Sequence, residues 1–359
     1  MRTLSLIILS AALAFGSSYG RKTVEISPLA PEIEYMGRIV KDSANVRFNY
    51  PGVTSLVNFE GERLAMKANP GAGKFMVEID GGAPQKVVFA ESDSVIVIAD
   101  SLAASRPHRA RITYAIEGYE KHPQWRGFAI EGKKPRILPA TRPSGPKIMF
   151  IGNSITCGYG TETTDPYEHF SYDNENHTLT YAYLAARDLD ADFHVVARSG
   201  IGIYRNYAGP RTGSDWGTMP LEFDNALIYD PSTRWDHSSF TPDIICINLG
   251  TNDTSLGDYD IALYEQAMSK FHSRLRALYP DAAIVLLSGC MLSPEVLADI
   301  RPAFARIAAG DANTYCLNFL PHMDYLGYGA DMHPSAAQHQ IMGAQLSNFL
   351  RTLPAASRR

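Results

Sequence analysis

The sequence predicts an α/β protein in which an N-terminal antiparallel β-sandwich of jelly-roll type precedes an α/β/α domain with a parallel sheet. Three observations predict this. Short β-rich runs separated by turn residues fill residues 24–133, a proline-rich segment follows at 135–146, and from residue 147 apolar runs alternate with helical patterns. Such alternation is typical of a parallel sheet with helices on both faces. We therefore expect the sandwich over 21–140 and the α/β/α domain over 145–355.

The first 20 residues have the pattern of a secretory signal peptide. Arg2 is the only charged residue among them, an apolar run covers residues 4–15, and small residues follow. A membrane anchor is the alternative, but the run is shorter than the ~20 residues that span a bilayer. We expect an exported protein, periplasmic or extracellular, that does not insert into a membrane after residues 1–20 are removed.

The composition is that of an ordinary globular chain. Of 359 residues, 45% are hydrophobic, and the formal net charge is −5. A mildly acidic chain argues against nucleic acid or an anionic membrane as the main partner. The four cysteines form no C-x-x-C pair, so we expect buried free thiols, with a disulfide as the alternative, and neither a metal site nor a cofactor. These cysteines are Cys157, Cys246, Cys290 and Cys316.

The elements of the sandwich are indicated by β-rich or alternating runs between turn residues. The runs lie at 74–79, 94–98 and 111–116, and the turns at 69–71, 80–82 and 91–93. No helical pattern appears in this part of the sequence. Short strands with regular turn signals fit an antiparallel jelly roll.

The elements after residue 147 follow in strand–helix order. Strands are expected at 147–151, 193–197, 243–249, 283–287 and 314–319, and helices at 179–188, 259–279, 294–309 and from 335. Since parallel strands gather their carboxyl ends at one edge of the sheet, residues that follow different strands can meet there.

A serine directly after the first of these strands is the candidate nucleophile. Ser154 follows the apolar run 147–151 and lies among small, turn-forming residues. Phosphate binding is the alternative for such a junction, but the lysine and spacing of a Walker loop are missing. A serine needs a base, and His333, on the loop before the last expected helix, is the candidate.

Two further segments after strands offer hydrogen-bond donors. Residues 199–202 contain Gly200 and Gly202, and residues 249–253 contain Asn252. Negative charge that develops on a substrate oxygen is stabilised by donors that already point at it. The alternative is structural: the glycines turn the chain, and Asn252 caps a turn.

In chain order these residues are serine, glycine, asparagine and histidine, an order that resembles the SGNH hydrolases. The whole chain resembles carbohydrate esterase family 2, in which a jelly roll precedes an SGNH domain. The resemblance implies that Ser154 attacks an ester carbonyl with His333 as base. It also implies an oxyanion hole made by the N–H groups of Ser154 and Gly202 and the amide of Asn252, Gly202 being preferred because it follows Ser199 by three residues. The matching segments are 126–128, 152–160, 199–206, 248–253 and 331–335.

Two positions depart from the superfamily pattern. The usual Asp-x-x-His would place an aspartate at position 330, where this chain has Ala330, and Asp331 lies two residues before His333 instead. The resemblance implies that Asp331 orients His333 in a triad, with a Ser–His dyad as the alternative. Asn153 stands where many relatives have aspartate.

The resemblance implies a serine carbohydrate esterase that removes O-acetyl groups from plant polysaccharides such as xylan and glucomannan, including groups at 6-positions, through an acetyl-enzyme. Aromatic residues between 204 and 242 are candidates for stacking on sugar rings, or alternatively for packing the loop. Those chosen are Trp216, Trp235 and Tyr204. The rival functions are a lipid or thioester hydrolase on the same fold, and a catalytically inactive carbohydrate-binding protein.

Overall fold

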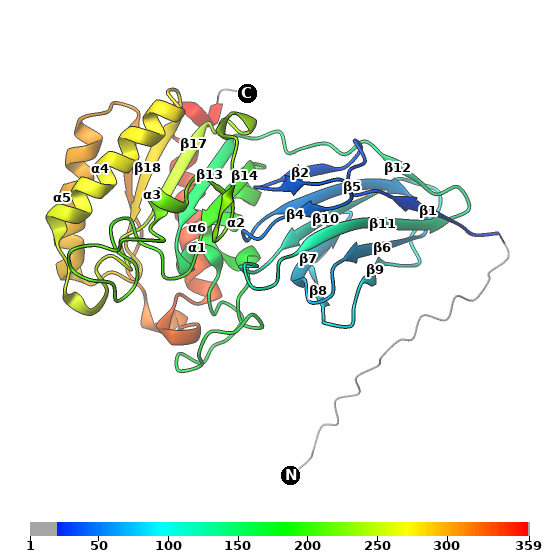
Figure 1. Cartoon of the computed structure of the whole chain (residues 1–359), viewed down its shortest axis with the longest axis horizontal. Helices are drawn as coiled ribbons and strands as arrows, with labels where there is room; N and C mark the ends of the chain where they lie inside the picture. The colour runs from blue at the N-terminus through cyan, green and yellow to red at the C-terminus, as the bar shows by residue number, and fades with distance from the viewer. Residues whose placement is uncertain (1–19, 358–359) are drawn as a thin grey trace, which may run out of the picture.

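The computed structural model describes residues 20–357. The signal-peptide prediction therefore concerns a segment that, apart from Gly20, lies outside the described residues. Two parts lie end to end along the long axis of the molecule: a β-sandwich, blue to cyan, and an α/β part, green to red (Figure 1). Among residues 20–357, no helix is long and apolar enough to cross a membrane.

The N-terminal part consists of two six-stranded antiparallel sheets, as the sequence predicts. One sheet has the order β3-β4-β11-β6-β9 with β1 beside β11, and the other has the order β12-β5-β10-β7-β8 with β2 beside β5. The strands are β1 (Lys22–Ile26), β2 (Glu34–Met36), β3 (Val40–Lys41), β4 (Val46–Arg47), β5 (Thr54–Glu60), β6 (Arg63–Ala68), β7 (Gly73–Ile79), β8 (Gln85–Phe89), β9 (Val95–Ala99), β10 (His108–Tyr114), β11 (Gln124–Gly132) and β12 (Arg136–Leu138).

An aromatic cluster fills the space between these sheets. Phe48 lies 4.0 Å from Trp125 and 5.2 Å from Tyr114, centroid to centroid, and Phe75 lies 5.1 Å from Tyr114. All four side chains are fully buried. Large aromatic rings bury much apolar area each, so this cluster stabilises the packing of one sheet on the other.

The C-terminal part has a five-stranded parallel sheet in the order β14-β13-β17-β18-β19. The strands are β13 (Lys147–Gly152), β14 (Asp192–Ala197), β17 (Ile244–Asn248), β18 (Ala283–Ser288) and β19 (Thr314–Asn318). Helices cover both faces. Met149 and Ile151 of β13 share a core with the helices Ile261–Leu278 and Pro294–Ala309, whereas Ile148 and Phe150 share a core with the helices Tyr181–Asp188 and Ala336–Arg351. Burial on both faces explains why these strands are continuous apolar runs.

All the α-helices of the described residues except Met219–Glu222 begin at side-chain caps. The hydroxyl oxygen of Ser293 accepts from Val296 N at the start of α5, and that of Ser335 accepts from Gln338 N at the start of α6. The helices are α1 (Ser154–Cys157), α2 (Tyr181–Asp188), α3 (Met219–Glu222), α4 (Ile261–Leu278), α5 (Pro294–Ala309) and α6 (Ala336–Arg351). The 3₁₀ turns are His177–Leu179, His237–Ser239, Ser255–Gly257, Asp324–Leu326, Ala330–Met332 and Pro354–Ser357.

In the α/β part, three elements other than the 3₁₀ turns were not predicted from the sequence. They are the short helices α1 and α3 and a two-stranded hairpin of β15 (Asn225–Leu227) and β16 (Asp230–Arg234). The last two lie in the long segment between β14 and β17, which was expected to be loop. All four cysteines are free thiols, and Cys316 alone among them is not fully buried.

The two parts are joined by buried polar contacts. The Arg38 guanidinium donates to the carbonyl oxygens of Phe223 and Asn225, at 2.6 Å each. The Glu78 carboxylate, in β7, accepts from the Tyr183 hydroxyl at 3.0 Å and from Arg187 at 2.8 Å. Because buried polar groups need partners, neither part presents this surface to solvent in the folded chain.

Candidate active site

Ser154 lies at the first residue of α1, directly after β13. The Asn153 side chain caps this short helix by accepting from Ile155 N at 3.1 Å, so asparagine serves the turn at this position. Gly152 is required before it, since an added Cβ would come within 2.0 Å of the Thr156 hydroxyl oxygen. The tight turn holds Ser154 at the carboxyl edge of the sheet, where it is 5% exposed.

His333 contacts Ser154 from the far end of the chain. Its Nε2 lies 2.9 Å from the Ser154 Oγ, and its Nδ1 lies 3.1 Å from the carbonyl oxygen of Ala330 and 3.3 Å from that of Asp331. Carbonyl oxygens only accept, so the Nδ1 carries the proton and the Nε2 lone pair accepts the serine O–H. Burial lowers the pKa of His333 to about 4, more than the two carbonyls raise it. His333 is therefore a neutral acceptor at pH 7.

In this structure the Asp331 carboxylate makes its hydrogen bonds to groups other than His333, in contrast to the predicted triad. It accepts from the Tyr159 hydroxyl, from His169 Nδ1 at 2.8 Å and from Phe170 N at 3.2 Å. The reason lies in the backbone, because Asp331 has φ +48° and the following residue is also left-handed. These angles turn the carbonyl oxygens toward the imidazole and leave the carboxylate on the Tyr159 side. The arrangement is a Ser–His dyad oriented by the backbone.

Tyr159 is a residue that the sequence reasoning missed. Its ring stacks on the His333 imidazole, with centroids 4.0 Å apart and an interplanar angle of 18°. It therefore connects the Asp331 carboxylate to His333 through a ring contact. Its signal was an aromatic residue between two glycines, Gly158 and Gly160, five residues after the candidate nucleophile.

Gly200 is the glycine that lines the cavity beside Ser154, whereas the sequence favours Gly202 as the donor. The Gly202 N–H donates to the Asn206 Oδ1 at 3.2 Å, and Gly202 does not line the cavity next to Ser154. An added Cβ on Gly202 would lie 1.9 Å from the Arg205 carbonyl oxygen, so this glycine serves packing. Gly200 lines the cavity, and its N–H has no acceptor within residues 20–357.

Asn252 lies where it was predicted, beyond the carboxyl end of β17. One hydrogen of its Nδ2 is donated to the carbonyl oxygen of Ile201 at 2.8 Å, which fixes the side chain. An amide nitrogen has two hydrogens, so the second stays available on the cavity side. Asn252 is thereby tied to the same loop that carries Gly200.

The residues just described open onto a cavity of about 760 Å³. Its lining includes Ser154, His333, Gly200 and Asn252 and also an apolar wall. The apolar wall is made by Leu256, Met291, Leu292 and Val296. A small set of polar groups in a mostly apolar cavity is typical of a small-molecule or polymer-end binding site.

The structure separates the three aromatic candidates. Trp216 is 68% exposed and does not line the cavity, but its carbonyl oxygen accepts from Asn206, in the loop that carries Gly200. Trp235 packs under the Arg38 guanidinium, 5.3 Å from CZ to ring centroid, and does not line the cavity. Tyr204 is buried, and its hydroxyl accepts from Asp260 N at 2.9 Å. Tyr207, 61% exposed at the cavity wall, was not chosen from the sequence.

Family models match both parts of the chain. The one described as Carbohydrate esterase 2 N-terminal matches residues 35–140, and the one described as GDSL-like Lipase/Acylhydrolase family matches residues 150–341. The chain is 32% identical over 326 residues to the cellulase/esterase CelE of Acetivibrio thermocellus, covering 88% of this chain and 39% of that protein. The chain thus spans well under half the length of that relative.

Two further relatives match almost end to end. An acetylxylan esterase / glucomannan deacetylase of Cellvibrio japonicus is 27% identical, with 92% of this chain and 91% of that protein covered. The structure of a family two carbohydrate esterase from Clostridium thermocellum in complex with cellohexaose superposes with a TM-score of 0.82 at 31% identity, covering 89% of this chain and 98% of that chain. With both parts of its fold matched in this way, the chain belongs to carbohydrate esterase family 2.

Proposed function

We propose that this chain is an exported serine carbohydrate esterase that removes O-acetyl groups from plant polysaccharides, xylan and glucomannan among them, through an acetyl-enzyme intermediate. The observation that carries the proposal is the 2.9 Å contact of Ser154 Oγ with His333 Nε2 at the wall of an open cavity. The activity named for the Cellvibrio japonicus relative supports the substrate class.

Acylation follows from the geometry. As Ser154 Oγ attacks the acetyl carbonyl carbon, His333 Nε2 takes its proton. The oxyanion that forms accepts hydrogen bonds from the N–H groups of Ser154 and Gly200 and from the Asn252 amide, none of which needs to move. The intermediate collapses when His333 returns the proton to the sugar oxygen, which leaves as an alcohol.

Deacylation repeats these steps with water. His333 Nε2 takes a proton from a water molecule, the hydroxide adds to the acetyl carbonyl carbon of Ser154, and the same three donors hold the oxyanion. The Ser154 Oγ then leaves with the proton, and acetate is released. The lowered pKa of His333, about 4, keeps the imidazole in the neutral form that both steps require at pH 7.

A longer-chain lipid or thioester hydrolase is the second candidate. The apolar wall formed by Leu256, Met291, Leu292 and Val296 favours it, because such a surface accommodates an alkyl chain. Comparing p-nitrophenyl acetate with the octanoate separates the candidates. An acetyl esterase has the higher kcat/KM on the acetate, and a lipid hydrolase has it on the octanoate.

The experiment that tests the proposal is acetate release from acetylated xylan and acetylated glucomannan by residues 21–359, run beside Ser154→Ala. We expect release by the native chain and a loss of at least about a thousandfold in the variant. No release from either glycan, with p-nitrophenyl acetate still cleaved, would contradict the substrate class. Binding of the glycans with no ester cleavage at all would favour an inactive carbohydrate-binding protein.

A further inference from the structure

A carboxylate from the β-sandwich reaches the loop that carries the Gly200 N–H. Glu117 lies just beyond β10 and is 1% exposed. One of its oxygens accepts from Ser199 N at 2.7 Å, and the other accepts from the Ser199 hydroxyl. Ser199 immediately precedes Gly200, so the sandwich holds the residue next to the predicted oxyanion donor.

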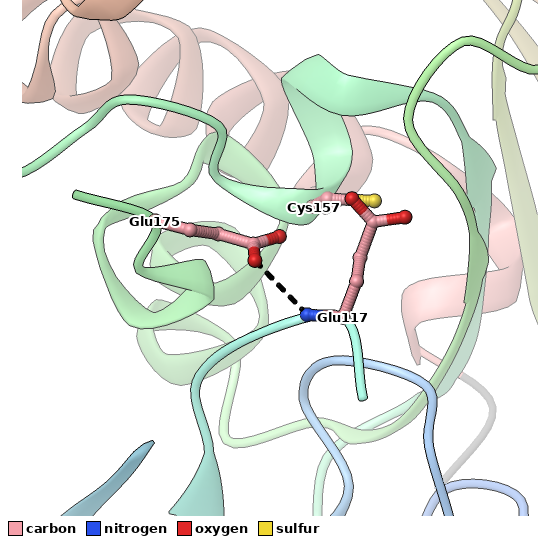
Figure 2. A group of neighbouring side chains, drawn as sticks. All are labelled: Glu117, Cys157 and Glu175. Carbon is pink, nitrogen blue, oxygen red and sulfur yellow. Dashed lines mark hydrogen bonds between the residues drawn. The ribbon is translucent and has the colours of Figure 1, made fainter. Parts of the chain in front are cut away.

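Glu117 belongs to a buried cluster with Glu175 and Cys157 (Figure 2). The Glu175 carboxylate accepts from Glu117 N at 3.1 Å, and ligand-type atoms of all three side chains lie within 4.8 Å of one another. Cys157 closes the short helix α1 that begins with Ser154. The cluster therefore touches both the nucleophile turn and the Gly200 loop.

Two buried carboxyl groups this close cannot both carry a charge at moderate cost. Burial raises the pKa of Glu117 and raises that of Glu175 well above its usual range. The Glu175 Oε1 is buried and has no hydrogen-bond partner within residues 20–357. When Glu175 is protonated on this oxygen, its O–H can donate a hydrogen bond to the Glu117 carboxylate.

The hydrogen bonds from Ser199 lower the pKa of Glu117 against the effect of burial, and the positive charge of Arg198, which is paired with Glu222 at 3.4 Å, lowers it further. Arg198 is itself fixed, since it donates to the carbonyl oxygens of Ser199 and Gly217 at 2.9 and 2.6 Å. Glu117 thus keeps both oxygens as acceptors for Ser199, which an amide or a protonated acid cannot do equally well.

We propose that Glu117 is a positioning residue for the oxyanion hole, held by a proton shared with Glu175, and that the β-sandwich thereby completes the active site. The inference rests on the proposed function, since it concerns the oxyanion hole of that site. Donors must already point at the oxyanion, so freeing Ser199 lets the Gly200 N–H drift and costs transition-state stabilisation more than substrate binding.

The chain offers a matched control. Glu78 is also a buried glutamate of the sandwich that accepts two hydrogen bonds across the interface, but from Tyr183 and Arg187, which are not in the Gly200 loop. Glu78→Ala therefore weakens the interface without freeing that loop. A loss of kcat in Glu117→Ala that exceeds the loss in Glu78→Ala is therefore caused by the freed Gly200 loop.

The experiment measures kcat and KM on p-nitrophenyl acetate, together with Tm, for both alanine variants and for Glu117→Gln. We expect Glu117→Ala to lower kcat by about 10–100-fold with KM changed less than about threefold. Glu78→Ala should lower Tm comparably and keep kcat within about twofold. Glu117→Gln should recover most of kcat, because its Oε1 accepts from Ser199 N and its Nε2 donates to the Ser199 hydroxyl.

If Glu117→Ala does not fold, Ser199→Ala takes its place. It removes one of the two bonds to Glu117 and no buried charge, and we expect a several-fold loss of kcat. Equal kcat losses in Glu117→Ala and Glu78→Ala, or native kcat in a folded Glu117→Ala, would overturn the inference.

A metal ion in place of the shared proton is tested separately. If the purified native protein contains stoichiometric divalent metal and the Glu175→Gln variant contains none, the inference that Glu117 and Glu175 share a proton is refuted. A native chain without any esterase activity would instead refute the proposed function, so the two failures are distinguishable.

Discussion

His333 is oriented by backbone carbonyl oxygens, and this affects how the imidazolium is stabilised during catalysis. The carbonyl oxygens of Ala330 and Asp331 lie 3.1 and 3.3 Å from its Nδ1. They fix the tautomer as a carboxylate would, but they supply dipoles rather than a full charge. The Asp331 carboxylate acts on His333 only indirectly. It accepts a hydrogen bond from the Tyr159 hydroxyl, and the Tyr159 ring stacks on the imidazole.

We therefore expect Asp331→Asn and His333→Ala to differ widely. His333→Ala removes the base and should lower kcat/KM by at least about a thousandfold. Asp331→Asn keeps an acceptor for the groups that bond it and leaves both carbonyl oxygens on His333, so the loss should stay below about tenfold. The measurement is kcat/KM on p-nitrophenyl acetate at pH 7.

Tyr159→Phe supplies the control, because it removes the hydroxyl that donates to Asp331 and keeps the ring on His333. Its loss should resemble that of Asp331→Asn, and the double variant should lose no more than either alone, since both changes remove one interaction. Equal losses in Asp331→Asn and His333→Ala would mean that the carboxylate contacts the imidazole during turnover.

Residue roles at this site differed in how far the sequence could predict them. Ser154, Asn252 and His333 lie where their motifs indicate, because each depends on following a strand or preceding a helix. Gly202 as the N–H donor and Asp331 as the partner of His333 stay predictions, although in this structure both groups bond elsewhere. Their roles depend on where an N–H or a carboxylate points, which is set by φ at single residues and is not encoded in spacing.

At the scale of elements, the segment between β14 and β17 places its two tryptophans in opposite environments. Trp216 is 68% exposed beside the Gly200 loop, whereas the Trp235 ring lies 5.3 Å from the Arg38 guanidinium and 5.6 Å from His194. An exposed ring beside that loop can stack on a sugar, and a ring packed on a buried guanidinium serves the interface.

We expect Trp216→Ala to raise KM for acetylated xylan by about 2–10-fold, the loss of one aromatic contact worth ~0.5–1.5 kcal/mol. KM for p-nitrophenyl acetate, which has no second sugar to stack, should not change. Trp235→Phe is the control and should lower Tm while leaving both KM values as they are. A rise in KM on both substrates for Trp216→Ala would show that the residue shapes the cavity instead.

Most elements could be predicted because they are long and periodic. The parallel strands and the helices α2, α4, α5 and α6 lie within a few residues of their predicted ends. The helix α1 has four residues and the strand β15 three, too few for a period to show. These short elements carry function all the same, since α1 presents Ser154.

At the scale of the whole molecule, the two parts share their buried polar groups. The proline-rich segment marks a change of composition, but it gives no sign that side chains such as Glu117 and Glu78 bond across the interface, because such pairs are distant in sequence. Hydrogen bonds between buried polar groups of the two parts fix the parts in one relative position. Local patterns therefore predict each part and not their contact.

His177 occupies this interface and makes it sensitive to pH. Its N–H donates to the carbonyl oxygen of Ala115 at 2.8 Å, and its Nδ1 lies 2.8 Å from the carbonyl oxygen of Thr156. Gly52, from the sandwich, lies so close that an added Cβ would come within 2.7 Å of the Nε2. Burial lowers the pKa of His177 to about 4, and the hydrogen bond to the Thr156 carbonyl oxygen offsets only part of this effect.

The sign of the effect follows from proton counting. Above about pH 6.5 the imidazole is neutral in both the folded and the unfolded chain. Between about pH 6.5 and pH 4 only the unfolded chain binds the proton, so stability falls as the pH falls, by up to about 3 kcal/mol. Buried acids with a raised pKa, such as Asp253 at about 6, act in the opposite direction, so the native curve alone does not isolate His177.

The difference between the native chain and His177→Asn isolates it. Asparagine can still donate to the Thr156 carbonyl oxygen through its amide, but it does not titrate. We expect the native chain to be the more stable at pH 7, and this advantage to shrink by about 3 kcal/mol by pH 4, as measured by urea unfolding at several pH values. A difference for His177→Asn that stays constant with pH would mean that the imidazole gains its proton in the folded chain without cost, through water reaching the interface.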